Sequence, residues 1–110
     1  MTVDGVWKVE VLAPYGWEAV STAFLENGRY LGASQDHYVI GQYTVSGNQV
    51  RVVGVSHAHG EGLNLFGAIE KDLELTFEGE IDGDQVDGQA EDKQGKYSIT
   101  FRATRLADFP

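Results

Sequence analysis

The chain has 110 residues, with 17 acidic and 8 basic side chains and a formal net charge of −9. A chain of this length builds one domain around one core, so we expect residues 1–110 to form a single domain. The negative charge repels a phosphate backbone, which argues against direct nucleic-acid binding and favours basic protein partners. No apolar run approaches the ~20 residues that a membrane-spanning helix needs, so we expect no membrane insertion.

The sequence contains no cysteine, which excludes disulfide bonds and thiolate metal sites. Its first ten residues, MTVDGVWKVE, are acidic and alternate polar with apolar side chains. They lack the basic region and the apolar core of a signal peptide. We therefore expect a cytoplasmic protein.

Short segments rich in Val, Tyr, Thr and Phe alternate along the chain with glycine-containing turns, which is the pattern of an all-β domain. Pairs such as Asn27-Gly28 and Gly47-Asn48 separate these segments and tolerate the positive φ of tight hairpins. We expect eight strands, at residues 5–13, 17–26, 29–34, 37–46, 49–57, 72–81, 85–91 and 96–106.

Consecutive strands usually pair with each other, and a meander of eight strands loses its exposed edges when it closes. The prediction is therefore an eight-stranded antiparallel up-and-down β-barrel. A barrel of this strand count either fills its interior with side chains or holds one small ligand.

The stretch HAHGEG, residues 57–62, is the strongest candidate for chemistry. Residues i and i+2 of a strand face the same way, so His57 and His59 could bind one metal ion together with Glu61 or His37. Alternatively, the strand ends near His57 and the glycines turn the chain, since Arg51 shares the face of His57 and marks it as solvated. We prefer the second interpretation and expect no metal and no cofactor.

Residues 54–58, Gly-Val-Ser-His-Ala, partly resemble the G-x-S-x-G turn that carries a serine nucleophile. The last position is Ala58, however, and the strand-to-helix context of a hydrolase is missing. The glycines at 60–67 match neither a dinucleotide-binding nor a phosphate-binding motif. We therefore expect a protein that is not an enzyme.

One long connection, residues 58–71, contains the apolar residues Leu63, Leu65, Phe66 and Ile69. Bare loops of this length are uncommon in compact domains, so we expect a short helix or a lid that caps one end of the barrel. Beneath such a lid, Tyr38, Gln42 or Tyr43 could supply the polar groups of a small-molecule site.

The first strand begins Gly5-Val6-Trp7, and Arg102 and Arg105 lie near the end of the last strand. This arrangement resembles the lipocalins (calycins), in which a tryptophan closes one end of the barrel and a basic side chain packs across it. An arginine over an indole face gains roughly 0.5 to 2 kcal/mol. Alternatively, Trp7 is simply a core aromatic residue.

Over residues 4–106, the phrases DGVWKVEV, LENGRYLGAS, HYVIGQYTVSGNQV, LELTFEGEIDGDQVDGQ and YSITFRAT resemble the GrlR-like family. These proteins are negative regulators associated with bacterial type III secretion. The resemblance implies a non-enzymatic, dimerising, lipocalin-like barrel that binds and sequesters a DNA-binding transcriptional activator. The family's founding member binds its partner through an exposed Glu-Asp-Glu-Asp tetrapeptide. The corresponding candidate here is the hairpin Ser46-Gly47-Asn48-Gln49, which carries no acid.

A homodimer is also expected from the residues themselves. If Val52 and Gly54 face the interior of the barrel, then Val53 and Val55 lie outside, and exposed aliphatic side chains on a strand commonly mark a contact surface. The leading hypothesis is a regulatory protein that binds another protein. The alternatives are a barrel that binds a small apolar molecule and a metal-dependent enzyme.

Overall fold

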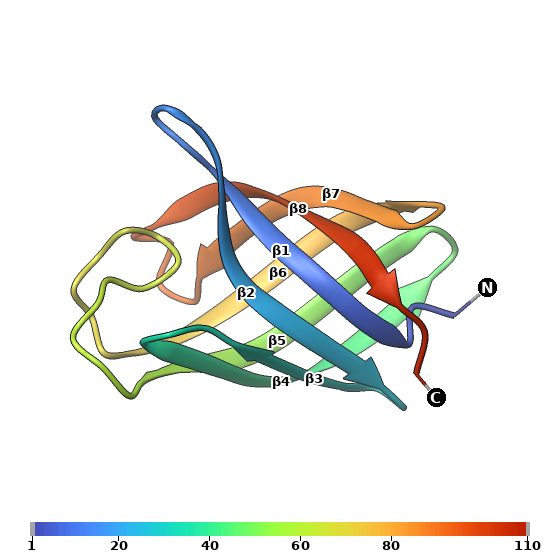
Figure 1. Cartoon of the computed structure of the whole chain (residues 1–110), viewed down its shortest axis with the longest axis horizontal. Helices are drawn as coiled ribbons and strands as arrows, with labels where there is room; N and C mark the ends of the chain where they lie inside the picture. The colour runs from blue at the N-terminus through green and yellow to red at the C-terminus, as the bar shows by residue number, and fades with distance from the viewer. Residues whose placement is uncertain (1, 110) are drawn as a thin grey trace.

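The computed structural model describes residues 2–109, in which eight antiparallel strands follow one another in chain order and close into a barrel (Figure 1). The strands are β1 (Gly5–Ala13), β2 (Gly16–Glu26), β3 (Arg29–Ala33), β4 (His37–Ser46), β5 (Gln49–Ala58), β6 (Asp72–Asp82), β7 (Gln85–Asp92) and β8 (Ser98–Ala107). β8 returns to pair with β1, which closes the sheet so that every strand has a neighbour on both sides.

The predicted all-β fold and the eight-stranded antiparallel up-and-down barrel are confirmed, with strand ends that differ from the predicted bounds by two residues or fewer. The short helix predicted in residues 58–71 is wrong, because that connection consists of bends and one turn. Residues 2–109 contain no helix, and hence none long and apolar enough to cross a membrane.

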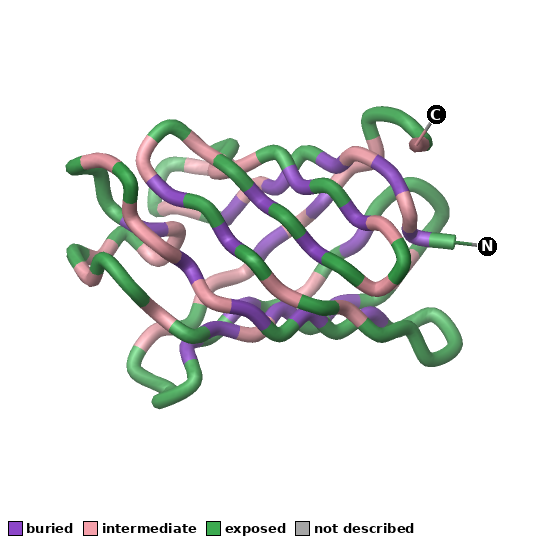
Figure 2. Tube along the Cα trace, turned by 90° about the horizontal axis from the view of Figure 1, so that it is seen from below, coloured by how far each residue is buried: buried purple, intermediate pink, exposed green. Residues whose placement is uncertain are grey.

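Buried and exposed residues alternate along most strands, because successive side chains point to opposite faces of the sheet (Figure 2). The inward face carries Leu75 and Phe77 in β6 and Phe101 and Ala103 in β8. Gly79 and Gly88 face each other across β6 and β7. A Cβ on Gly88 would lie 1.9 Å from the carbonyl oxygen of Glu78, so this pairing requires glycine.

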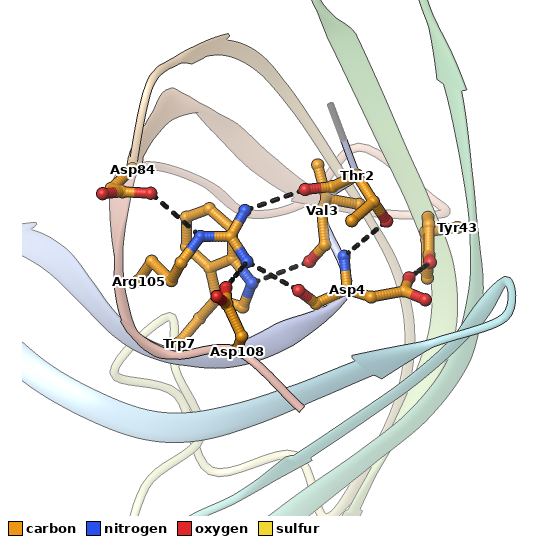
Figure 3. Close-up of polar contacts among 8 residues, drawn as sticks. All are labelled: Thr2, Val3, Asp4, Trp7, Tyr43, Asp84, Arg105 and Asp108. Carbon is orange, nitrogen blue, oxygen red and sulfur yellow. Dashed lines mark hydrogen bonds and ion pairs between the residues drawn. The ribbon is translucent and has the colours of Figure 1, made fainter. Parts of the chain in front are cut away.

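One end of the barrel is closed by Trp7 and Arg105 (Figure 3). The Arg105 guanidinium lies 4.6 Å from the centre of a Trp7 ring, and the indole Nε1 donates to the carbonyl oxygen of Val3. Arg105 also donates to the main-chain carbonyl oxygens of Thr2 and Asp4, at 2.8 and 2.6 Å. The predicted stacking of a late arginine on Trp7 is therefore present, with Arg105 as the basic partner.

Arg102, the other candidate, has a different role near the middle of β8. It lies 4.2 Å from the centre of a Trp17 ring and pairs with Glu10 at 3.0 Å on the outer face of β1. The N-terminal residue of β1 must be glycine, since a Cβ on Gly5 would lie 2.6 Å from the carbonyl oxygen of Ala107 and 2.7 Å from the Arg105 guanidinium. In the motif Gly5-Val6-Trp7, Gly5 thus allows β8 to approach closely, and Trp7 supplies the indole that closes the barrel.

Candidate functional site

The end of the barrel opposite Trp7 contains a cavity of about 650 Å³ that opens to solvent. Four connections surround this end: the β1–β2 hairpin, the β3–β4 turn, residues 59–71 and the β7–β8 turn (Figure 1). The cavity is lined by residues of the first three connections and by inward side chains of the strands.

The opening results from unequal strand lengths. β2 pairs with β3 only from Thr22 to Glu26, so residues 16–21 have no partner on that side. A register shift opposite Val9 leaves Val20 as an extra residue in β2, and such a bulge twists a strand away from its neighbours. Consistent with this, the β1–β2 hairpin projects from the barrel (Figure 1). This hairpin and the β3–β4 turn both contribute residues to the cavity lining, and we refer to this side as the mouth of the cavity.

Tyr30 and Phe77 form the floor of the cavity, with ring centres 5.8 Å apart. Beneath them is a second cavity of only about 40 Å³, lined almost entirely by core side chains that include Trp7. The barrel is therefore packed at its closed half and hollow at its open half.

The side chain of Tyr30 is fully buried, and burial raises its pKa far above the ordinary value while the Ser21 hydroxyl acts in the opposite direction. The phenol is consequently neutral and is available only as a hydrogen-bonding group. Gly32, two residues along β3, makes room for it, since a Cβ there would lie 3.2 Å from the tyrosine ring.

Ser56 is the most distinctive polar residue of the lining. It points inward from β5, is 2% exposed, and its Oγ has no hydrogen-bond partner among residues 2–109. A buried hydroxyl without a partner costs about 1 to 3 kcal/mol. Buried His37 on the adjacent strand also lines the cavity.

Residues 59–71 act as a lid whose shape is organised by Asn64 rather than by a helix. The buried Asn64 Oδ1 accepts hydrogen bonds from the main-chain amides of Phe66 and Ala68, and its Nδ2 donates to the carbonyl oxygen of Glu70. These bonds replace helical ones, and Gly67 adopts a positive φ of 75° that closes the turn.

The four apolar residues predicted to form the lid divide into two groups. Leu63, Leu65 and Phe66 line the cavity, and Phe66 stacks on Tyr97 at 5.8 Å between ring centres. Ile69 is not part of the lining and is 82% exposed.

The stretch HAHGEG fastens this lid to the β3–β4 turn. The main-chain amides of His59 and Gly60 donate to the carbonyl oxygen of Asp36. The Asp36 carboxylate lies so close to the loop that a Cβ on Gly60 or Gly62 would be 2.2 or 2.1 Å from its oxygens. The two glycines therefore accommodate Asp36, a residue that the sequence analysis did not single out.

The two histidines of this stretch do not converge on a common point with other ligands. His57 Nδ1 lies 3.0 Å from Asp72 Oδ1, whereas His59 Nε2 lies 3.1 Å from the carbonyl oxygen of Ser34. Tyr38 stacks beside both rings, at 5.2 and 5.9 Å between ring centres. Within residues 2–109, no group of three or more His, Asp or Glu side chains is arranged to hold a metal ion.

The polar residues expected beneath the lid are mostly elsewhere. Tyr38 contributes to the rim, but Gln42 is exposed and Tyr43 lies at the closed end, where its hydroxyl donates to the Asp4 carboxylate (Figure 3). Ser56 and Tyr30 take their place as the buried polar groups of the cavity. Tyr30 was missed, although its alternation with Gly32 in β3 is a signal for an inward aromatic side chain.

The predicted partner-binding hairpin, Ser46-Gly47-Asn48-Gln49, lies at the closed end, and all four of its residues are exposed. Beside it lie acidic residues of the neighbouring strands. Gln49 pairs with Glu80, and the amide of Ile81 donates to the carbonyl oxygen of Asn48. The hairpin and the end of β6 thus form one continuous surface.

The outer face of β2–β5 carries a row of apolar side chains. Phe24 pairs with Leu31, Leu31 with Ile40, and Ile40 with Val55, so the row crosses four strands. Val53, two residues before Val55 and therefore on the same face, is 50% exposed. The predicted outward register of the two valines is confirmed.

No protein-family model matches this chain, and no curated protein sequence matches it.

Proposed function

We propose that this protein binds a small, mostly apolar molecule in the cavity at the open end of its barrel. The observation that carries this proposal is the preformed cavity of about 650 Å³ with the unpartnered Ser56 hydroxyl in its wall. Ligand sites typically have volumes of about 300 to 1,000 Å³ and combine apolar walls with a few polar groups that fix orientation.

The apolar walls supply the binding energy. Val9, Val39, Leu65, Phe66 and Phe77 all line the cavity, and an apolar ligand that leaves water to contact them gains about 25 cal/mol for each Å² buried. The Ser56 hydroxyl can donate or accept one hydrogen bond, which orients the molecule and removes the cost of an unpaired buried group.

The proposed function is binding without catalysis. A serine nucleophile requires a general base within hydrogen-bonding distance, and Ser56 Oγ makes no hydrogen bond to His37 or to any other residue in the range 2–109. The neutral Tyr30 phenol is likewise placed to form a hydrogen bond and not to abstract a proton.

The test is a fluorescence titration with N-phenyl-1-naphthylamine, an uncharged probe that brightens in apolar surroundings. We expect saturable binding at one site per chain, and we expect Val20→Trp, which places an indole in the cavity, to weaken binding at least tenfold. Val45→Trp adds the same group at an exposed position near the β4–β5 hairpin and serves as the control. Absence of saturable binding, or equal binding by both variants, would contradict the proposal.

A second candidate function is the binding of a basic protein partner, as in the GrlR-like regulators that the sequence resembles. The observation in its favour is the outer face of β6 and β7, where acidic side chains surround a shallow groove that runs along the two strands. The groove residues are Gln49, Thr76, Glu78, Gly79, Glu80, Asp87, Gly88, Gln89 and Glu91. The acids that the hairpin 46–49 lacks are therefore present beside it.

In this role the protein acts in the cytoplasm and sequesters a DNA-binding activator whose positive surface meets this face. Affinity capture from the source cells tests it, with the double substitution Glu78→Lys and Glu80→Lys compared with Glu61→Lys on the lid. We expect a DNA-binding protein that is captured by the wild type and by the control but not by the double variant. Capture that does not depend on these two acids would contradict the proposal.

We also propose a homodimer through the apolar row of Phe24, Leu31, Ile40 and Val55. Copies with a net charge of −9 repel each other, and this uncharged row is a surface where two copies can meet without placing acidic side chains against each other. Sedimentation velocity tests the proposal. We expect a dimer that Ile40→Lys converts to a monomer and that Leu106→Lys, at another exposed apolar position, leaves intact. A monomeric wild type at high concentration would refute it.

A further inference from the structure

We propose that the cavity selects uncharged or cationic amphiphiles and rejects carboxylates of the same chain length, an inference that rests on the binding function proposed above. The ligand is then an apolar molecule that ends in a hydroxyl or an amine rather than a fatty acid. Three observations support this selectivity: the charges of the lining, the pairing of nearby lysines, and the chemistry of Ser56.

The lining contains two carboxylates, one buried histidine, His37, and no lysine or arginine. Glu18 from β2 and Asp36 from the β3–β4 turn are its only acidic residues, and none of the eight lysines and arginines of the chain contributes to it. A carboxylate that enters this cavity loses hydration and meets no lysine or arginine that would compensate. The negative charge of the whole chain opposes its approach as well.

The lysines nearest the open end are each paired with a carboxylate. Lys71 lies 3.9 Å from Glu61, Lys96 lies 3.3 Å from Glu70, and Lys93 lies 3.4 Å from Glu74. Among residues 2–109, each lysine near the open end therefore has a carboxylate neighbour that weakens its attraction for an anion.

A hydroxyl or an amine meets complementary groups instead. The Ser56 hydroxyl accepts from or donates to an alcohol, whereas a carboxylate can use it only as a donor. An ammonium group at the mouth meets the carboxylates of Glu18 and Asp36. The same lining therefore accommodates a hydroxyl or an ammonium head group, but it does not accommodate an anionic one.

The test is displacement of N-phenyl-1-naphthylamine at pH 7.4 by 1-octanol, octylamine and octanoate, which each contain eight carbon atoms. We expect octanol and octylamine to displace the probe at concentrations at least tenfold lower than octanoate. Octanoate that competes as well as octanol would overturn the selectivity. A probe that does not bind at all would overturn the proposed function itself, so the two failures are distinguishable.

Two variants identify the groups responsible. Glu18→Lys places a cation at the mouth and should raise octanoate affinity severalfold while lowering octylamine affinity, whereas Asp82→Lys, an exposed position at the closed end, should change neither. Ser56→Ala should weaken octanol roughly threefold to tenfold, the loss expected for one hydrogen bond, and leave the probe unaffected. Octanoate affinity that is unchanged by Glu18→Lys would contradict the role of charge.

Discussion

Substitution of Arg105 by alanine should destabilise the barrel more than the loss of any exposed ion pair. The Arg105 side chain is 11% exposed and makes three kinds of contact: stacking on Trp7 at 4.6 Å, hydrogen bonds to the carbonyl oxygens of Thr2 and Asp4, and an ion pair with Asp84 at 2.9 Å. Stacking contributes about 1 kcal/mol and hydrogen bonds from a charged donor about 1.5 to 3 kcal/mol, with overlap between them. We expect a total loss of about 3 kcal/mol.

Thermal unfolding followed by circular dichroism measures this loss. For a chain of about this size, 1 kcal/mol corresponds to roughly 4 °C, so we expect Tm to fall by about 12 °C. Arg29→Ala is the matched control, because Arg29 is 70% exposed and only pairs with Glu26, and its effect should stay within about 0.5 kcal/mol. A loss below about 1 kcal/mol for Arg105→Ala would refute the idea that this residue holds the closed end together.

Three further predictions concern the lid and two titrating groups. Gly62→Ala should lower the free energy of unfolding by about 1 to 2 kcal/mol in the wild type and by almost nothing in an Asp36→Ala background, because the added Cβ would contact the Asp36 carboxylate. Chemical denaturation of the wild type, the two single variants and the double variant measures this coupling. The hydrogen bond from Arg102 lowers the pKa of Glu10, so the ionised Glu10 stabilises the fold above its unfolded pKa, and this stabilisation is lost as pH falls through its folded pKa. NMR titration of Arg102→Gln should show the pKa of Glu10 returning toward its ordinary value. Burial raises the pKa of Tyr30, so absorbance at alkaline pH should show one tyrosine that ionises only on unfolding, and stability should fall as pH rises above the ordinary tyrosine pKa.

The fold could be predicted because local patterns determine it. Turn pairs such as Asn27-Gly28 fix the hairpins, and the alternation in β6 and β8 fixes which face is inward. The motif Gly5-Val6-Trp7 with a late arginine correctly indicated the closed end. The choice between Arg102 and Arg105 was not available from the sequence, because it depends on the register between β8 and β1.

The cavity could be predicted only in outline. Its volume depends on the bulge at Val20 and on the short β3, which are consequences of pairing between strands and have no local sequence signal. The helix expected in the lid failed because one side chain, Asn64, satisfies the main-chain groups of the loop and Gly67 closes the turn. Apolar composition alone cannot distinguish such a loop from a helix.

The stretch HAHGEG shows how tertiary contacts change the meaning of a motif. The spacing of His57 and His59 would allow both to bind one metal ion, yet each ring contacts a different neighbour. Gly60 and Gly62 are needed for packing, because the Asp36 carboxylate occupies the space that side chains at these positions would need. The motif fastens the lid over the cavity mouth, which connects it to the proposed binding function.

The central claim is that the open half of the barrel holds an apolar ligand, and NMR tests it most directly. Titration of ¹⁵N-labelled protein with 1-octanol should shift the amide signals of lining residues, including Val20, Tyr30, Ser56 and Phe66, and leave the closed end around Val86 unchanged. Shifts confined to the outer apolar row, or no saturable shifts at all, would contradict the claim.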